Sequence, residues 1–579
     1  MAQPTTSPAP NLQGAGTRQN TYDAIVIGSG ISGGWAAKEL AEKGLKTLVL
    51  ERGRDVKHGD YPTAFTESWE FPLRNRIPAT EIAKQEKQNR TGYTTHPATS
   101  HWFVNDVEHP YHEEKRFDWM RGYHVGGRSL LWGRQSYRWS DLDFEANAKE
   151  GVTIDWPIRY KDLAPWYDHV ERFAGISGSK ENLPQLSDSQ FLPPMELNCL
   201  EQQVRRRIAD SFGGRAMIIG RVANLTVPHN GRGNCQSRNR CSRGCPYGAY
   251  FSSNASTLPA GYATGNLTLR PFSIVSEIVY DKNSGRASGV RIIDAQTSEA
   301  IEYRAKVIFC CASAVASTAI LMNSKSERFP AGLGNDSGAL GHYLMDHHFK
   351  VGATGLSDDF ADKYYHGQRP NGIYIPRFRN LDRATTRKDY LRGFGYQGSA
   401  SRSDWTSPIK ELNYFGAKLK ADLIAPGPWR MGIGSWGECL PYHENRMTLD
   451  ATRRDKWGQP TVKFDVEWKE NELAMRKDMK QSAVEMLEAA GLKNVTPFDD
   501  VVNSAPGNCI HEMGTARMGR DPKTSVLNAH NQVHACPNVF VTDGACMTSN
   551  ACVNPSLTYM ALTARACDHA VSELKKINL

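Results

Sequence analysis

The chain has 579 residues, of which 70 are basic and 62 are acidic, so its formal net charge is +8. Spread over this length, the charge is mild and forms no long basic run, which argues against nucleic-acid binding. An apolar fraction of 40% with 13 tryptophans is typical of a folded protein and excludes a disordered scaffold. The size predicts roughly two to four domains.

Two stretches bear on targeting and membranes. The first twenty residues, 1–20, are rich in Pro, Gly, Ser, Thr and Gln, and they predict a flexible tail rather than a signal peptide. The longest nearly apolar stretch, 307–322, is shorter than the roughly 20 residues that a membrane-spanning helix needs. We therefore expect no transmembrane segment and interpret this stretch as a buried strand followed by a helix.

The first structural motif begins at residue 22 and reads YDAIVIGSGISGGWAAKELAEKGLKTLVLERG. Residues 24–27 and 47–50 have the composition of short β-strands, and residues 35–43 have that of a helix. A glycine-rich turn lies between the first strand and the helix. Strand, glycine turn, helix and strand in this order form the unit that binds a dinucleotide.

The small and acidic residues of this unit have predicted roles. Gly28 permits the tight turn, Gly30 lets the backbone approach a pyrophosphate, and Gly33 lets the helix pack closely on the strand. Glu51 ends the second strand, where a carboxylate can accept hydrogen bonds from ribose hydroxyls. The motif does not distinguish FAD from NAD. The turn residues predicted to contact the cofactor are Gly28, Gly30, Ile31, Ser32 and Gly33.

Three later segments carry a family resemblance. They are RGYHVGGRSLLWG at 121–133, DWPIRYKDLAPWY at 155–167 and VTDGACMTSNACVNPSLTYMALTARA at 541–566. Together with the first motif, they resemble the glucose-methanol-choline (GMC) oxidoreductases from residue 22 to the carboxyl terminus. The resemblance implies an α/β fold, in which a Rossmann-like FAD-binding domain is assembled from separate segments and carries an inserted substrate domain built on an antiparallel sheet.

The same resemblance predicts the domain boundaries. The segments expected to form the FAD-binding domain are 21–60, 119–346 and 502–579, with a cluster loop at 231–250. The segments expected to form the substrate domain and its lid are 61–118 and 347–501. The last of these is rich in aromatic and polar residues, which suit sugar binding and equally suit a sheet that covers the site.

The glycine-rich segment and the closing segment supply further expected flavin contacts. The resemblance implies that Gly126 and Gly127 let the backbone lie close to the isoalloxazine ring and that Ser129 hydrogen-bonds its polar edge. It places Asp543 near the ribityl or pyrophosphate portion. Some sugar oxidases of the family tether FAD through a histidine of the glycine loop, but the corresponding residue here is Leu131. We therefore expect FAD to be bound without a covalent link.

A β-hairpin is predicted at 270–294, where two β runs flank the polar turn KNSG. In similar proteins, the first strand of this hairpin places an apolar side chain over the adenine. We expect Val275 in that position. The alternative interpretation of Val275 is an ordinary residue of the sheet.

The candidate catalytic residues lie near the carboxyl terminus. His511 stands in GNCIHEMGTARMG, and Asn554 follows it just before a proline. Oxidation of an alcohol requires loss of the hydroxyl proton as hydride leaves the carbon, and imidazole is a suitable base. The resemblance implies that His511 is this base and that Asn554 donates a hydrogen bond to the same oxygen. Glu512 is the alternative base, whereas His347 and His348 are expected to be structural.

Three of the twelve cysteines lie close in sequence. Cys235, Cys241 and Cys245 have the spacing C-x5-C-x3-C, and a proline follows the last. Zinc usually takes four ligands, whereas three thiolates suit a 3Fe-4S cluster. The same spacing occurs in catalytic subunits of bacterial FAD-dependent glucose dehydrogenases, where the cluster passes electrons from flavin to a cytochrome. The alternative is a loop of reduced or disulfide-linked cysteines, and the other nine cysteines are expected to be small buried residues.

Over its whole length, the sequence resembles the bacterial glucoside 3-dehydrogenases, which oxidise the C3 hydroxyl of glucose and glucosides to 3-keto sugars. This implies an FAD-dependent dehydrogenase with a sugar or glycoside substrate, a cytochrome c acceptor and a small co-exported subunit that brings it to the periplasm. A cytoplasmic location, a glucose C1 dehydrogenase and an oxygen-using sugar oxidase are alternatives. A non-catalytic FAD electron-transfer subunit is the alternative of another class.

Overall fold

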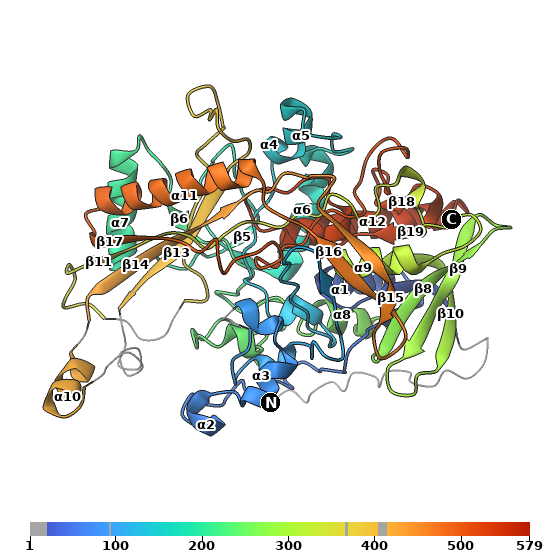
Figure 1. Ribbon diagram of the computed structural model, residues 1–579, viewed down its shortest axis with the longest axis horizontal. Coiled ribbons are helices and arrows are strands. Elements are labelled where there is room, and N and C mark those ends of the chain that lie inside the picture. The colour runs from blue at the N-terminus through green and yellow to red at the C-terminus, as the bar shows by residue number, and fades with distance from the viewer. Residues whose placement is uncertain (1–19, 92–93, 365–368, 403–413, 426) are drawn as a thin grey trace.

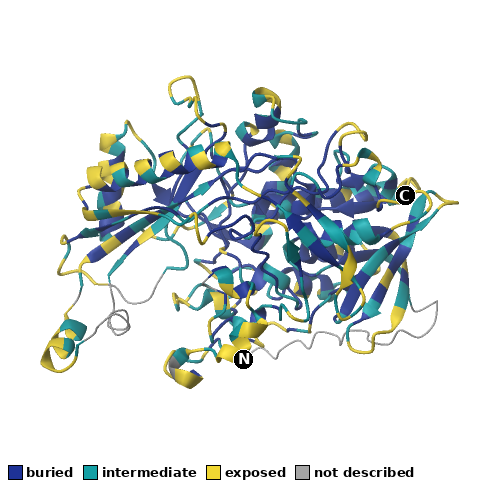
Figure 2. Cartoon of the chain, in the orientation of Figure 1, coloured by how far each residue is buried: buried dark blue, intermediate teal, exposed yellow. Residues whose placement is uncertain are grey.

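The computed structural model describes residues 20–91, 94–364, 369–402, 414–425 and 427–579. Except for Asn20, the tail predicted at 1–20 therefore lies outside the described residues. The chain forms two sheet-based halves that lie side by side, with helices packed against both (Figure 1). The buried residues concentrate inside each half and in the region between the halves (Figure 2).

The larger sheet has eight strands and a parallel centre. Its strands are β1 Thr21–Ile27, β2 Thr47–Leu50, β7 Leu267–Arg270, β8 Ser273–Asp281, β9 Arg286–Asp294, β10 Ala300–Cys310, β18 Gln532–Val533 and β19 Cys536–Val541. The order is β18-β19-β10-β1-β2-β7, and the antiparallel pair of β8 and β9 joins the sheet through β10. Neighbouring strands from β19 to β7 run parallel, so their carboxyl ends share one edge.

Both faces of the parallel strands are buried, which explains their continuous apolar runs. The helices around this sheet are α1 Ile31–Glu42, α6 Tyr160–Ala174, α8 Thr257–Ala263, α9 Ala314–Asn323 and α12 Ser556–Lys575. In β1, Ala24 and Val26 belong to a core that includes residues of α1 and α12, whereas Ile25 and Ile27 belong to a second core. Two cores are expected because side chains alternate between the faces along a strand.

The sequence-based predictions for these elements are confirmed. The predicted strands at 24–27 and 47–50 correspond to β1 and β2, and the hairpin at 270–294 corresponds to β8 and β9. The stretch at 307–322 forms the end of β10 and most of α9. One sheet is thus built from chain segments that are far apart in sequence, which confirms the predicted α/β class.

The second sheet has six antiparallel strands. They are β6 Ile218–Ile219, β11 Val351–Ser357, β12 Ile373–Ile375, β13 Phe394–Arg402, β14 Trp429–Gly437 and β17 Lys493–Asp499. Helix α11 (Glu470–Ala489) lies across this sheet (Figure 1), and its Met475 and Met479 share a core with Phe394 and Tyr396 of β13. The order is β17-β11-β14-β13-β12-β6, so β13 lies inside the sheet.

Smaller features complete the fold. A three-stranded sheet consists of β3 His112–Glu113, β15 Arg446–Arg454 and β16 Pro460–Asp465. Strand β6, which the sequence assigned to the FAD-binding domain, pairs with β12 in the six-stranded sheet; the predicted domain boundaries themselves stay a prediction.

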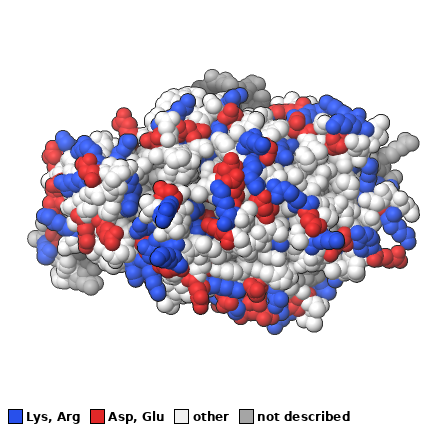
Figure 3. All heavy atoms as spheres, turned by 90° about the horizontal axis from the view of Figure 1, so that it is seen from above, with Lys and Arg blue, Asp and Glu red and all other residues white. Residues whose placement is uncertain are grey.

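Among the described helices, none combines the length and apolar character of a membrane span. Basic and acidic side chains are interspersed on the face shown in Figure 3.

Candidate active site

A cavity with a volume of about 320 Å³ lies at the carboxyl ends of the parallel strands. Four of the residues that line it each follow a different strand: Gly28 follows β1, Glu51 follows β2, Ala312 follows β10 and Asp543 follows β19. Ligands of open α/β sheets bind at this edge of the sheet. The parallel strands therefore bring together residues from four separate parts of the chain.

The turn between β1 and α1 leaves the amino terminus of the helix open to the cavity. Gly28 has φ +91°, and a Cβ there would lie 2.7 Å from the Cys311 carbonyl oxygen. A Cβ on Gly33 would lie 2.0 Å from the Gly28 carbonyl oxygen, whereas one on Gly30 would meet no atom within 4 Å. No side chain caps this end of α1, so its N–H groups can hold an anionic pyrophosphate. The predicted turn residues that line the cavity are Gly28, Gly30, Ile31 and Ser32.

Glu51 is held by the same turn through Ser29, which sequence reasoning missed. Ser29 donates to Glu51 Oε2 from its hydroxyl at 2.5 Å and from its backbone N–H at 3.1 Å, and the Gly53 N–H donates to Oε1 at 2.9 Å. The Ser29 hydroxyl also accepts from the Gly126 N–H at 2.9 Å. Burial raises the pKa of Glu51. Ser29 thus links the two glycine-rich turns. Its position between Gly28 and Gly30 was the feature of the sequence that could have identified it.

The second glycine-rich turn packs against the first. Gly126 has φ +86°, and a Cβ there would lie 1.7 Å from Asn254 Oδ1, while a Cβ on Gly127 would lie 3.5 Å from the Gly30 Cα. The Ser129 hydroxyl donates to the Gly126 carbonyl at 2.5 Å. Because a serine hydroxyl has one proton to donate, Ser129 can meet a flavin only as an acceptor. Its predicted contact with the flavin stays a prediction.

Val275 and Asp543, which have predicted cofactor roles, also line the cavity, as does Leu131, which takes the place of a tethering histidine. The Asp543 carboxylate accepts from the Ser317 hydroxyl at 2.5 Å and from the Ala545 N–H at 3.0 Å. Burial raises the pKa of Asp543 to about 6. Val275 in β8 supplies apolar surface, and Leu131 lacks any group that could form a bond to a cofactor.

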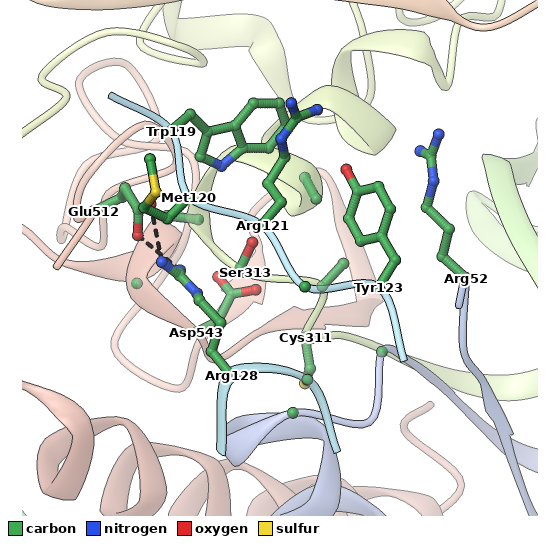
Figure 4. A pocket seen from close by; sticks show the side chains of 18 of the residues that line it. Arg52, Trp119, Met120, Arg121, Tyr123, Arg128, Cys311, Ser313, Glu512 and Asp543 are labelled. Carbon is green, nitrogen blue, oxygen red and sulfur yellow. Dashed lines mark hydrogen bonds and ion pairs between the residues drawn. The ribbon is translucent and has the colours of Figure 1, made fainter. Parts of the chain in front are cut away.

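Aromatic and basic side chains form a wall of the cavity that sequence reasoning missed (Figure 4). The Arg121 guanidinium lies 4.4 Å from the centre of the Trp119 ring and pairs with Asp106 at 3.0 Å. The Arg52 guanidinium lies 4.7 Å from the centre of the Tyr123 ring. Alternation of aromatic and basic residues in WMRGY, just before the second glycine turn, was the signal that could have found Trp119, Arg121 and Tyr123.

The structure brings His511 and Asn554 together. Their Nε2 and Nδ2 atoms are 3.3 Å apart although 43 residues separate them in sequence, and both residues line the cavity. Burial lowers the pKa of His511 well below its ordinary value, and the charge of Arg128 lowers it further. A neutral imidazole beside an amide donor can take a proton from a hydroxyl and stabilise the oxygen that loses it.

Asp346, which sequence reasoning also missed, holds the loop that carries His511. Its carboxylate accepts from the backbone N–H groups of Gly507, Cys509 and His511 at 2.9, 3.0 and 3.0 Å. Ile510 has φ +60°, a conformation that costs a β-branched residue about 1–3 kcal/mol. Burial raises the pKa of Asp346 to about 7. The three hydrogen bonds hold the strained loop in place and thereby fix the position of His511.

Glu512, the alternative base, is engaged in an ion pair. Arg128 donates to its two carboxylate oxygens at 3.0 and 2.7 Å (Figure 4), and the Glu512 side chain is only 2% exposed. A bidentate guanidinium occupies both carboxylate oxygens and directs them away from a substrate hydroxyl. The geometry therefore favours His511 over Glu512 as the base.

Two residues of the surrounding structure support the pair of His511 and Asn554. His347, expected to be structural, places its Nδ1 3.1 Å from His511 Nδ1. Gln397 of β13 donates from Nε2 to Asn554 Oδ1 at 2.8 Å. His348 is fully buried and does not line the cavity. The contacts of His347 and Gln397 depend on segments distant in sequence, so no local pattern signalled them.

The cysteine loop lies next to the cavity. Cys235, Cys241 and Cys245 are half-buried free thiols, and the nearness of the other two adds to the effect of burial in raising the pKa of Cys235. Ser242 of the same loop lines the cavity. All twelve cysteines are free, so the disulfide alternative finds no support, and Cys199 differs from the expected burial because it is half-buried. Three thiols on one loop provide the donor chemistry of an iron-sulfur cluster.

The cavity suits FAD in its chemistry. The open end of α1 fits the pyrophosphate, and the acids at the ends of β2 and β19 can accept hydrogen bonds from hydroxyls. The Tyr559 hydroxyl also lines the cavity, and within the described residues it is buried without a hydrogen-bond partner. A buried polar group of this kind is expected to bind a ligand or water.

Comparison with known proteins finds related sequences over nearly the whole chain. Family models of the GMC oxidoreductases match residues 22–349 and 441–563. The chain is 29% identical over 564 residues to the 2-methyl-1,2-propanediol dehydrogenase of Mycolicibacterium austroafricanum, with 96% of each chain covered. It is 25% identical over 571 residues to the fructose dehydrogenase large subunit of Gluconobacter japonicus, with 96% of this chain and 98% of that one covered.

A solved structure shares the fold. The formate oxidase of Aspergillus oryzae RIB40 superposes with a TM-score of 0.60 at 13% identity, covering 96% of this chain and 99% of that one. The amino-terminal family model alone spans more than half of the chain. The protein therefore belongs to the GMC oxidoreductases, a family of enzymes that bind FAD and act on CH–OH groups.

Proposed function

We propose that the protein is an FAD-dependent dehydrogenase that oxidises a secondary hydroxyl of a sugar or glycoside, most favourably the C3 hydroxyl of glucose or a glucoside. The observation that carries the proposal is the 3.3 Å distance between His511 Nε2 and Asn554 Nδ2 in the cavity that also receives the open end of α1. One cavity then combines a dinucleotide site with a base and an amide donor.

In this proposal, His511 and Asn554 act on the substrate hydroxyl. His511 accepts the hydroxyl proton at Nε2, because burial keeps its imidazole neutral. Asn554 donates a hydrogen bond from Nδ2 to the same oxygen and stabilises its developing negative charge. FAD, when bound, would accept the hydride from the carbinol carbon. The ion pair of Arg128 and Glu512 keeps this carboxylate from competing for the proton.

FAD would be held without a covalent bond by residues of both glycine turns and of the strand ends. Gly33 would contribute only by packing α1 against β1. The residues proposed to contact or orient the cofactor are Gly28, Ser29, Gly30, Ile31, Ser32, Glu51, Gly126, Gly127, Ser129, Val275 and Asp543.

A polyhydroxylated substrate is supported by the cavity wall and by the relatives. Trp119 and Tyr123 present aromatic surface, and Arg52 and Arg121 present hydrogen-bond donors, a mixture that suits sugar rings and their hydroxyls. Two relatives are named for a diol and for fructose. Selection of C3 rests on the resemblance of the sequence to glucoside 3-dehydrogenases.

We also propose that Cys235, Cys241 and Cys245 hold a 3Fe-4S cluster. Support comes from three free thiols on one loop whose Ser242 lines the cofactor cavity. The cluster would carry electrons to a cytochrome c, and a small co-exported subunit would accompany the protein to the periplasm. An iron assay and an EPR spectrum of the purified protein test this: Cys241→Ser should lose the signal and retain the flavin, and a wild-type protein without iron would refute the cluster.

The enzymatic proposal is tested by mixing the purified enzyme with methyl glucoside without oxygen. We expect the flavin absorbance to bleach and the product to show a 3-keto group by NMR. The reduced enzyme is then given either oxygen or an artificial dye as the electron acceptor. A dehydrogenase should reduce the dye quickly and form little peroxide with oxygen, whereas an oxidase should form peroxide and reduce the dye slowly. Failure of glucose, glucosides and other sugars to bleach the bound flavin would refute a sugar dehydrogenase.

A further inference from the structure

The carbonyl oxygen of Ala551 determines the direction of a chain of hydrogen bonds that ends at the substrate site. This oxygen lies within hydrogen-bond distance of His347 Nε2. A backbone carbonyl only accepts hydrogen bonds, so Nε2 of His347 must carry a proton. Burial lowers the pKa of His347 to about 4, which keeps its ring neutral and leaves Nδ1 without a proton.

The acceptor at His347 then determines the state of His511. The two Nδ1 atoms are 3.1 Å apart, and the rings meet nearly edge to face at 82°. Since His347 Nδ1 can only accept, His511 must donate from its Nδ1. Cys509 Sγ lies 3.5 Å from the same nitrogen, and burial keeps this thiol neutral by raising its pKa, so it adds only a weak contact. A neutral His511 therefore has its free lone pair on Nε2.

The opposite end of the chain of hydrogen bonds is consistent with this direction. Asn554 Nδ2 faces His511 Nε2 at 3.3 Å, and Asn554 Oδ1 accepts from Gln397 Nε2 at 2.8 Å. An amide N–H donates to a nitrogen lone pair, whereas an amide oxygen there would require a proton on Nε2. The order of donors and acceptors from Gln397 to Ala551 is thus satisfied by a single arrangement of protons.

We infer that His347, anchored by the Ala551 carbonyl, is a positioning residue that fixes His511 in the tautomer with its proton on Nδ1 and its lone pair on Nε2. The inference rests on the proposed function, in which Nε2 takes the hydroxyl proton. His347 touches neither the substrate nor the cofactor cavity, because it is 1% exposed and does not line the cavity. Its effect on the reaction passes through His511, in the way that a buried hydrogen-bond acceptor orients a catalytic imidazole.

The tautomer can be read directly by imidazole 15N NMR on the holoenzyme labelled with 15N-histidine, using His511→Ala to assign the signals of His511. In the wild type, we expect Nδ1 of His511 to have the chemical shift of a protonated ring nitrogen and Nε2 that of an unprotonated one. The reverse pattern would overturn the inference. This measurement does not depend on any His347 variant folding, and it reads the tautomer whether or not His511 is the base.

Two His347 variants separate positioning from mere packing. His347→Leu removes the acceptor, and it should lower the rate constant of flavin reduction about 10- to 100-fold with little change in KM. His347→Asn offers an amide oxygen to His511 Nδ1 and should recover most of the rate. Equal losses in both variants at wild-type flavin content would overturn the inference. Full activity in His511→Ala would instead refute the proposed function, while the NMR result on the tautomer would stand.

Discussion

His511 is half-buried at the edge of the cavity and in contact with His347, and this environment sets its protonation. Burial removes solvation from the imidazolium, so the pKa of His511 lies well below its ordinary value of 6.5. The neutral base is then present at every pH near neutrality, although a base of low pKa attracts a proton weakly. The amide of Asn554 offsets this weakness because it stabilises the oxygen that loses the proton.

The depressed pKa predicts the pH dependence of the chemical step. A base must be unprotonated to act, so a lower pKa shifts the acid limb of the rate profile to lower pH. We expect the rate constant of anaerobic flavin reduction to stay level on acidification through pH 6.5, the ordinary pKa of histidine, and to fall only below it. Stopped-flow absorbance in matched buffers measures this profile. A limb centred at or above pH 6.5 would mean that the pKa of His511 is not lowered or that His511 is not the base.

Gly30, which precedes α1, and Gly33, in its first turn, are glycines for two different reasons. A Cβ on Gly33 would lie 2.0 Å from the carbonyl oxygen of Gly28, whereas a Cβ on Gly30 would meet no atom within 4 Å and would face the cavity. Gly33→Ala should therefore destabilise the apoprotein by about 1–3 kcal/mol, since the backbone must move. Gly30→Ala should leave the stability of the apoprotein unchanged and weaken FAD binding.

This glycine pair tests whether the cavity at α1 holds the cofactor. Urea unfolding of the apoproteins gives the stability, and titration with FAD followed by flavin fluorescence gives the affinity. The two variants serve as controls for each other because each adds one methyl group to the same turn. Normal FAD affinity in Gly30→Ala would place the pyrophosphate away from this end of the helix.

Strand β13 of the six-stranded sheet contributes to the site through Gln397, which orients Asn554. Gln397→Leu removes the donor to Asn554 Oδ1, and loss of about 1 kcal/mol of orientation should slow flavin reduction roughly 5-fold. Gln397→Glu replaces the donor with an acceptor and favours the reversed Asn554 amide, so a larger loss is expected. Stopped-flow reduction at equal flavin content measures both. Rates within twofold of wild type in both variants would contradict this orienting role.

Local patterns sufficed for some elements and residues and failed for others. Continuous apolar runs and the glycine turn predicted β1, β2 and the helix between them. Both faces of a parallel strand are buried, so the strand is apolar along its whole length and its own sequence is enough to identify it. The family resemblance brought His511 and Asn554 together. Asp346, His347 and Gln397 were missed because each acts on a segment more than 150 residues away, and only folding reveals such contacts.

Across the whole molecule, buried neutral histidines link stability to pH. Burial lowers the pKa of both His124 and His347 to about 4, from an ordinary 6.5. A lowered pKa in the folded state means that stability present above pH 6.5 is lost as the pH falls toward 4. Each such shift corresponds to roughly 3 kcal/mol of linkage, since one pKa unit is about 1.4 kcal/mol.

We therefore expect the urea concentration at the unfolding midpoint of the holoenzyme to decrease as the pH is lowered from 7 to 5. This range brackets the ordinary histidine pKa of about 6.5. His124→Phe cannot take up a proton and should show a weaker dependence on pH than the wild type. His569→Phe is the matched control, since this histidine is partly exposed and its loss should leave most of the dependence in place. A midpoint of His124→Phe that depends on pH as steeply as the wild-type midpoint would contradict this linkage.

The catalytic pair lies where the two halves of the molecule meet. His511 is in the connection from β17 of the six-stranded sheet to β18 of the larger sheet, and Gln397 of β13 contacts Asn554. The proposed reaction requires His511 to take the hydroxyl proton in this setting. Its most direct test is the rate constant of flavin reduction by sugar in His511→Ala, at a flavin content equal to that of the wild type. We expect a fall of at least about 100-fold. A rate within a few-fold of the wild type would contradict it.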